Sequence, residues 1–277
     1  PCPPYIYSSM TANAGSIKNT GIEIGITGVV FDKKDFGWTT SVNYSHNKNV
    51  LLSLSNDQFM AADYSDQGST GEPMQQSTHR LQGGQPLGNF YGFKSIDIDE
   101  TGHWIIEGED GNPKPCLDQQ PTDKQILGNG IPSHYLNWNN NLRWKGFDLG
   151  IQIRGAFGFE ILNLTAAKWG TPTMLTRGNV LKSAFDKVYG KAVLADDQPC
   201  QYVSYYVEKG DYVKIDNITL GYTFDFNKPC FKSLRLFTTI RNAATFTGYS
   251  GIDPELSVTG LAPGVDSYTR YPATRSY

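Results

Sequence analysis

Amide and guanidinium side chains recur at every second position in several parts of this sequence, where they alternate with apolar residues. The set consists of Asn137, Asn139, Asn141, Arg143, Gln152, Arg154 and Arg241. Their N–H groups are hydrogen-bond donors that suit sugar hydroxyls, peptide carbonyls and carboxylates. We therefore predict that these residues share a polar surface and are candidates for binding a substrate. Contacts among themselves are the open alternative.

No catalytic arrangement accompanies them. The sequence has no GxSxG, Walker or HExxH motif, and its four histidines are scattered. Asp196-Asp197, or Glu107 with Glu109, could act as paired carboxylates in glycoside hydrolysis, but acidic pairs in polar loops are usually solvated surface. We predict that the chain is not an enzyme, has no catalytic residues and needs no cofactor.

The alternation identifies the elements that carry the candidate residues. From residue 147 to 161 the apolar positions are Phe147, Leu149, Ile151, Ile153, Phe157, Phe159 and Ile161. Polar or small residues lie between them, and only a β-strand places two such sets on opposite faces. An apolar face opposite a charged face fits a strand with hydrocarbon on one side and water on the other. We predict an all-β fold, a transmembrane antiparallel β-barrel.

Three hairpins show the same alternation around a short turn. We place these turns at 32–35, at Lys145-Gly146 and at Asn227-Lys228-Pro229. Aromatic residues flank each turn, as expected of side chains at a membrane interface. Long polar connections lie at the opposite ends, at 53–82, 107–132, 163–202 and 243–268. Short turns on one side and long loops on the other are typical of outer-membrane barrels.

Further elements complete the expected architecture. A strand pair at 87–98 and 103–106 brings the count to about eight strands, and 269–277 indicates the start of a ninth. A short helix is predicted at 180–188, where apolar residues share a face. The first and last strands would leave unpaired edges, which are costly in lipid, so these strands need the rest of a barrel. The opening Pro1-Cys2-Pro3-Pro4 has no Met or signal peptide, so we expect an upstream segment.

Composition removes two other classes of protein. The net charge is −3 and the lysines and arginines are dispersed, so we expect no nucleic-acid partner. The sequence contains no run of about 18 apolar residues, so we expect no membrane-spanning helix. The four cysteines are Cys2, Cys116, Cys200 and Cys230. Each lies in a Pro-containing loop segment, and both disulfides and free thiols remain open.

Several segments, in this order, resemble the SusC/RagA-type TonB-linked outer-membrane transporters of Bacteroidetes. They are NTGIEI (19–24), GQPLGNFYGF (84–93), LGN (127–129), VKIDNITLGY (213–222) and the stretch from RN to DPE (241–255). Because they span nearly the whole chain, the resemblance is specific to the C-terminal barrel portion of that family.

The resemblance implies that residues 1–277 are the C-terminal part of a barrel of about 22 strands, with long extracellular loops, in the outer membrane of a Gram-negative bacterium. Neither the family's N-terminal plug nor its TonB-contacting segment is in this sequence. The expected partners are a SusD-like surface lipoprotein, the TonB complex, outer-membrane lipid and a second SusC/SusD-type pair. The implied function is import of oligosaccharides or oligopeptides, with the candidate residues facing the lumen. Contact with the plug is a further alternative for them.

Two other interpretations stay open. The family's acidic loop is represented here by 107–112, where carboxylates could hold Ca²⁺, but the ligand order departs from the EF-hand pattern, and we assign no metal. The competing function is a secreted β-sandwich that binds carbohydrate. A sandwich buries large side chains in mid-strand, whereas here they crowd the turns.

Overall fold

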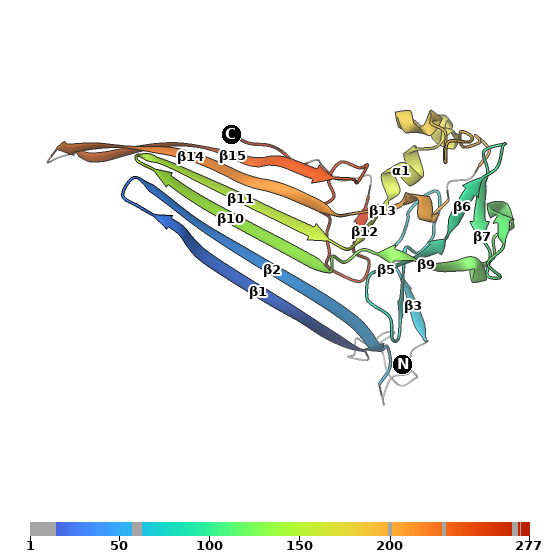
Figure 1. The fold of residues 1–277 in the computed structure, drawn as a ribbon. Helices are drawn as coiled ribbons and strands as arrows, with labels where there is room; N and C mark the ends of the chain where they lie inside the picture. Colours follow the sequence, from blue (N-terminus) through green and yellow to red (C-terminus); the bar gives the residue numbers. More distant parts are fainter. Residues whose placement is uncertain (1–14, 57–62, 199–200, 229–230, 268–270, 272) are drawn as a thin grey trace, which may run out of the picture.

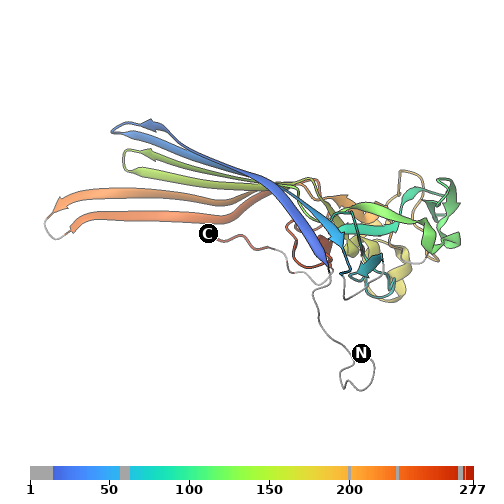
Figure 2. The same ribbon diagram turned by 90° about the horizontal axis from the view of Figure 1, so that it is seen from below.

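A computed structural model describes residues 15–56, 63–198, 201–228, 231–267, 271 and 273–277. Six long antiparallel strands form one sheet in the order β1-β2-β10-β11-β14-β15. They are β1 (Ser16–Asp32), β2 (Phe36–Ser53), β10 (His134–Trp144), β11 (Phe147–Phe157), β14 (Tyr212–Lys228) and β15 (Phe231–Thr247). These strands extend side by side away from the rest of the chain (Figure 1 and Figure 2). The predicted all-β fold is confirmed, and within the described residues the sheet does not close on itself.

The remaining elements gather at one end of the sheet in a compact unit that we call the end domain (Figure 1). Its strands are β3 (Tyr64–Gln67), β4 (His79–Gln82), β5 (Asn89–Phe93), β6 (Ser95–Ile98), β7 (Trp104–Glu107), β8 (Pro113–Pro115), β9 (Lys124–Asn129), β12 (Glu160–Asn163), β13 (Val207–Lys209) and β16 (Val265–Asp266). They form small sheets in the orders β3-β4-β5-β9, β6-β7-β8 and β13-β12-β16. Its helices are α1 (Leu164–Trp169) and 3-10 turns at Cys116–Asp118, Pro121–Asp123, Pro172–Thr176, Lys182–Phe185 and Ser204–Tyr206.

The three predicted hairpins are present. Residues 33–35 join β1 to β2, and Lys145-Gly146 joins β10 to β11. Lys145 adopts a positive φ of 53°, and a Cβ on residue 146 would lie 2.8 Å from the carbonyl oxygen of Thr223, which explains the glycine there. β14 pairs with β15 as the third hairpin, but Pro229 of its predicted turn lies outside the described residues.

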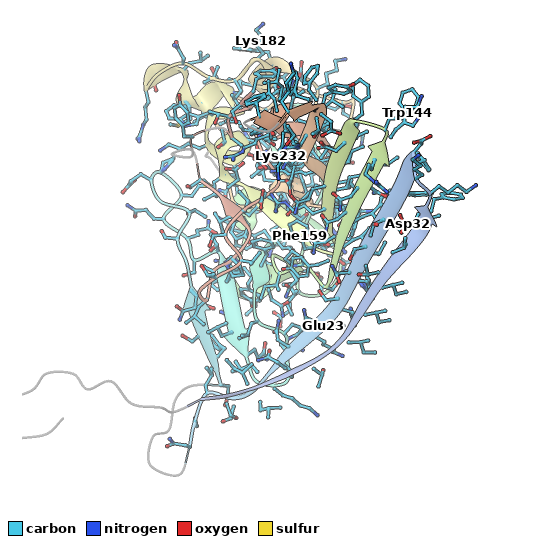
Figure 3. The ribbon with its side chains drawn as sticks, turned by 90° about the vertical axis from the view of Figure 1, so that its left-hand side faces the viewer. Glu23, Asp32, Trp144, Phe159, Lys182 and Lys232 are labelled. Carbon is cyan, nitrogen blue, oxygen red and sulfur yellow. The ribbon has the colours of Figure 1, made fainter. Side chains whose placement is uncertain are left out.

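Strand register divides the long sheet into two faces, because directly paired residues project to the same side. One row pairs Trp38, Leu142, Leu149 and Leu220 in succession, and it belongs to what we call the apolar face. A row three residues further along the strands projects to the other side and contains Ser41, Asn139, Gln152 and Asn217, so it belongs to the polar face. Trp144 projects from the outside of the curved sheet, whereas Phe159 lies on its inside (Figure 3). The predicted two-sided strands are therefore correct.

Aromatic side chains form a band where the strands meet their short turns. Ring contacts with centroid separations of 4.5–6.3 Å link Trp144, Phe147, Tyr222, Phe224, Phe226 and Phe231 in succession. Phe31, Phe36 and Trp38 make similar contacts in the first hairpin. The predicted clustering of aromatic residues beside the turns is confirmed.

The strand predicted over 147–161 is too long. β11 ends at Phe157, because Gly158 adopts φ +73° and its N–H donates to the Asp211 carboxylate at 2.7 Å. Phe159 and Ile161 therefore leave the apolar face and are buried in a cluster with Tyr212 on the inside of the sheet. Alternation alone could not reveal this, because the period of two continues across the glycine.

Two other predicted elements are corrected. Segments 87–98 and 103–106 are not long sheet strands, since β5, β6 and β7 belong to the small sheets of the end domain. The long sheet thus has six strands among the described residues, not about eight. The predicted helix at 180–188 is only the 3-10 turn Lys182–Phe185. The helix α1 begins at Leu164 and is capped by Asn163, whose side chain accepts a hydrogen bond from the Ala166 N–H. An isolated bridge between Ser276 and Arg241 lies in the segment predicted to begin another strand.

The end domain has its own hydrophobic core. Its fully buried side chains include Phe90, Trp104, Ile106, Leu162 and Tyr202. Cys116 joins this core as a free thiol, and burial raises its pKa to about 12, while the other three cysteines lie outside the described residues. In the described part of the chain, no helix is both long and apolar enough to cross a membrane.

Candidate functional site

The register brings all the candidate residues to the polar face. Asn139, Gln152 and Arg241 lie in one row, connected through Asn217 of β14. Asn137 and Arg154 are direct partners in the next row toward the end domain. On the other side follow the row of Asn141 and then the row of Arg143. The predicted shared surface therefore exists, and their role as binding residues stays a prediction.

Two hollows divide these residues. Asn139, Asn141 and Gln152 line a depression of about 370 Å³ in mid-sheet, together with Asn217 and Thr219. Asn137 and Arg154 line a second hollow of about 210 Å³, which is closed on one side by Pro254, Glu255 and Leu256. Arg143 and Arg241 line neither of these hollows.

Charges near the short turns pair across strands. The guanidinium of Arg235 donates to both carboxylate oxygens of Asp148, at 3.0 and 2.6 Å. Arg143 donates to Asp32 at 3.4 Å and is exposed. Between these pairs and the end domain, the polar face carries mainly amide and hydroxyl groups, with Thr219 and Thr239 joined at 3.0 Å. Apart from Arg241, which lies in the row of Asn139 and Gln152, this stretch is therefore mainly an uncharged, hydrogen-bonding surface.

Five charged residues form a cluster where the polar face meets the end domain, and we call it the charge clamp. It consists of Arg154, Lys214, Asp216, Asp253 and Glu255. The Lys214 ammonium donates to Asp253 at 2.8 and 3.1 Å and to Glu255 at 2.8 Å, and this residue is only 2% exposed. Arg154 donates to Asp216 and to both carboxylate oxygens of Glu255. The clamp ties the connection after β15 to β11 and β14.

The clamp also sets the electrostatics of this corner. Hydrogen bonds from Arg154 lower the pKa of Glu255 to about 2, with burial opposing the shift and Lys214 adding to it. Arg154 therefore donates its hydrogen bonds to carboxylates of this chain, Asp216 and Glu255, which were not among the partners expected for it. Sequence reasoning missed Lys214, Asp216, Asp253 and Glu255 as a unit. Their only signal was that both segments belong to the motifs shared with the SusC/RagA family.

Asn129, which belongs to another of the shared motifs, also links separate strands by hydrogen bonds. The Asn129 side chain donates to the carbonyl oxygen of Leu87 and to Asn89, both at 2.7 Å. Its backbone N–H donates to Glu160 at 2.7 Å. Asn129 thus holds β9 against the chain near β5 and against β12. At Asn129 and in the charge clamp, the residues shared with the family therefore connect separate parts of the fold.

The acidic loop at 107–112 is a hydrogen-bonded turn. Asp110 accepts hydrogen bonds from the Asn112 backbone at 3.0 Å and from its side-chain amide at 2.8 Å. Asp123 accepts from Glu109 N–H and from the Lys114 ammonium. Within the described ranges, no group of three or more His, Cys, Asp or Glu residues is arranged to hold a metal ion.

Several known proteins are similar to this chain over most of its length. TonB-dependent receptor P3 of Formosa agariphila is 27% identical over 100% of the chain and 30% of its own length. TonB-dependent receptor SusC of Bacteroides thetaiotaomicron is 26% identical over 90% of the chain and 25% of its own length. No protein-family model matches.

The fold is similar to that of two solved structures of a peptide importer. A structure described as the RagAB peptide importer in the 'closed-closed' state has a TM-score of 0.77 and 20% identity, covering 95% of this chain and 29% of that chain. Another, of the RagAB peptide transporter, has a TM-score of 0.75. The six long strands therefore have the fold of a barrel-wall segment. Over nearly its whole length the chain is similar to SusC/RagA-type TonB-dependent receptors, and it spans about 25–30% of the length of the curated relatives it matches.

Proposed function

We propose that the chain is the C-terminal part of an outer-membrane TonB-dependent importer that takes up an oligosaccharide or oligopeptide. It would act by passage of the solute along the polar face, without chemistry on it. The relatives named above are TonB-dependent receptors, and the solved neighbours are described as peptide transporters or importers. These names support the importer class.

One observation carries this proposal: the apolar face of the long sheet is uncovered. Ile26 is 66% exposed and Leu220 is 45% exposed, although both lie in mid-strand. Soluble proteins rarely leave a continuous apolar surface of this kind. Lipid acyl chains can cover this apolar face without a penalty in free energy. If the sheet lies in a bilayer, the aromatic band is at one membrane interface. The short turns would face the periplasm and the end domain the cell exterior.

The chemistry of the polar face supports the proposed solute, an oligosaccharide or oligopeptide. Its mid-sheet hollow offers amides from Asn139, Asn141, Gln152 and Asn217 and the hydroxyl of Thr219. Neutral groups of this kind pair with sugar hydroxyls or peptide amides, whereas an ionic solute would favour unpaired opposite charge. The lumen-facing candidates thus remain Asn137, Asn139, Asn141, Arg143, Gln152 and Arg241. Arg154 is proposed to act mainly within the clamp.

The partners follow from the same proposal. A SusD-like surface lipoprotein would dock on the extracellular end domain, and TonB would act through a part of the protein outside this sequence. We further propose a dimer of such receptor–lipoprotein pairs. Large, partly polar interfaces suit such docking.

The alternative of a secreted carbohydrate-binding β-sandwich is less well supported. A sandwich needs a second sheet about 10 Å from the first, packed on its apolar face. Within the described residues no element covers that face, and Ile22, Ile24 and Leu236 are more than half exposed.

The decisive experiment is to extract the native protein from outer membranes in mild detergent and to identify the intact chain and its co-purifying proteins by mass spectrometry. A longer polypeptide with a bound lipoprotein is the expected result. A small species that is soluble without detergent would overturn the proposal in favour of the secreted module.

A second experiment tests the lumen-facing residues. The double variant Asn139→Ala/Gln152→Ala removes two donors from the mid-sheet hollow, and uptake of the solute should fall. The matched control is Thr238→Ala, which removes a polar group from the apolar face. Equal uptake by both variants, at equal receptor levels, would remove these amides from the transport path.

A further inference from the structure

The apolar face is not apolar along its whole length, and the change occurs at the end-domain side. In β2 the residues on this face run from Phe36 through Val42 and Tyr44 to His46 and then Lys48. On the neighbouring strand β1, Lys18 lies on the same face. The surface therefore passes from hydrocarbon-like side chains to basic side chains near the end domain.

The charge on this face is of one sign. In the paired rows from Lys18 and Val50 to Phe224 and Leu234, the apolar face carries no carboxylate, and its lysines are Lys18 and Lys48. Both lysines are exposed, and within the described part of the chain neither forms an ion pair. We call Lys18 and Lys48 the basic rim.

The two lysines are close enough to act together. Lys48 pairs with Thr20, so Lys18 is its diagonal neighbour across the strand pair. Diagonal neighbours on one face lie about 7–8 Å apart, and flexible lysine side chains can converge on one anion across that gap. Two stacked imidazole rings, His46 and His134 with centroids 4.5 Å apart, lie between the rim and the apolar residues.

The imidazole pair is held in place. Tyr44 Oη and His134 Nδ1 are hydrogen-bonded at 2.8 Å, and His46 Nδ1 donates to the carbonyl oxygen of Ser133 at 3.0 Å. The rim thus has a fixed polar border where it meets the hydrocarbon-like surface. Such a border fits the level at which lipid headgroups begin.

The position of the rim matches a bilayer. Twelve residue steps separate Phe36 in the aromatic band from Lys48, which is about 40 Å along the strand at ~3.3 Å per residue. With a strand tilt of about 40°, the two levels are roughly 30 Å apart across the membrane. That distance places the rim at the far headgroup level when the aromatic band lies at the near one.

We propose that the basic rim binds the phosphate groups of a phosphorylated lipid in the outer leaflet. The inference rests on the proposed membrane location of the sheet. Ammonium groups beside an apolar surface suit a ligand that has an anionic head and acyl chains, since both parts of the surface are then covered. The rim would thereby hold annular lipid at the foot of the end domain.

The test uses the whole receptor purified in detergent, with native mass spectrometry as the readout. The probes are a bis-phosphorylated glucosamine lipid and the same lipid with its phosphates removed. The wild type should retain the phosphorylated lipid, and Lys18→Gln/Lys48→Gln should retain several-fold less. The matched control Lys33→Gln/Lys34→Gln removes the same charge at the opposite turn and should retain the wild-type amount. Lys18→Arg/Lys48→Arg should preserve retention.

The outcomes separate this inference from the proposed function. A membrane-embedded receptor that retains both probes equally, or loses the phosphorylated lipid equally in both Gln variants, overturns the lipid site and leaves the importer standing. A wild-type receptor found outside the membrane overturns both. If Lys18→Gln/Lys48→Gln does not accumulate, the single variants and the Arg pair decide by the same readout.

Discussion

The long sheet and the end domain use apolar residues in opposite ways. In the end domain, Trp104 is 1% exposed and Ile106 is fully buried, because three small sheets and α1 enclose them. In the long sheet, Ile26 and Leu220 keep about half or more of their surface exposed. Both regions alternate apolar and polar residues, so the pattern alone does not say what covers the apolar side. In one region the chain covers it, and in the other we propose that lipid does.

The charge clamp joins these two regions, and breaking it should have the largest effect. Lys214→Met leaves Asp253 buried without its cation, which should cost about 3–5 kcal/mol in the free energy of unfolding. The measurement is the guanidinium unfolding midpoint of the detergent-solubilised receptor. The control Asp148→Asn breaks the exposed pair with Arg235 and should cost no more than about 1 kcal/mol. Similar losses would mean that the clamp does not connect the regions.

The contrast in coverage gives a second prediction. Ile106→Ala removes a fully buried side chain from the end domain and should cost about 2–5 kcal/mol, since a cavity remains. Ile26→Ala in the long sheet should cost much less, because detergent or lipid fills the space. The two unfolding midpoints, measured side by side, check this. A larger loss for Ile26→Ala would contradict the assignment of the two regions.

The two faces of the long sheet can be tested with one cation. Ile151→Arg places a charge on the apolar face and should cost about 2–4 kcal/mol at mid-bilayer, so the amount assembled in the outer membrane should fall. Gln152→Arg places the same charge on the polar face and should assemble far better. Leu220→Arg and Thr219→Arg form a second matched pair. Equal assembly within each pair would refute a lipid-facing surface.

A pH effect is expected in the end domain. Burial lowers the pKa of His79 to about 4, while its ring bonds the Pro263 carbonyl at 2.9 Å. As pH falls below 6.5, His79 becomes protonated in the unfolded chain but stays neutral in the folded chain. The stability contributed by this residue is therefore fully present above pH 6.5 and declines toward pH 4. From pH 7 to 5.5 the loss should be on the order of 1 kcal/mol.

The readout for His79 is the protease sensitivity of the segment at 257–264 as a function of pH. His79→Gln, which keeps a hydrogen-bonding side chain and does not titrate, should show no added sensitivity in this window. An identical pH profile in wild type and variant would mean that His79 is not the titrating group.

The sequence was sufficient for the hairpins, their short turns, the aromatic band and the face of each candidate residue. All of these depend on neighbours a few positions apart, and a strand's period of two carries that information locally. Asn139 and Gln152 are direct partners because a two-residue turn sets the register of β10 and β11. The family motifs could also be recognised in the sequence, but the structural contacts of their residues could not be predicted from it.

Only the tertiary structure decided where the long connections go. Gly158 ends β11, so Phe159 and Ile161 are buried on the inside of the sheet, and segments 87–98 and 103–106 fold into the end domain. Lys214 and Asp253 are 39 positions apart in the sequence and are joined by a hydrogen bond. Glu255 of the same cluster accepts a hydrogen bond from Arg154, so the Arg154 side chain is engaged within the clamp. No local period encodes such contacts, because they form only when distant segments lower their energy by burying charges and side chains together.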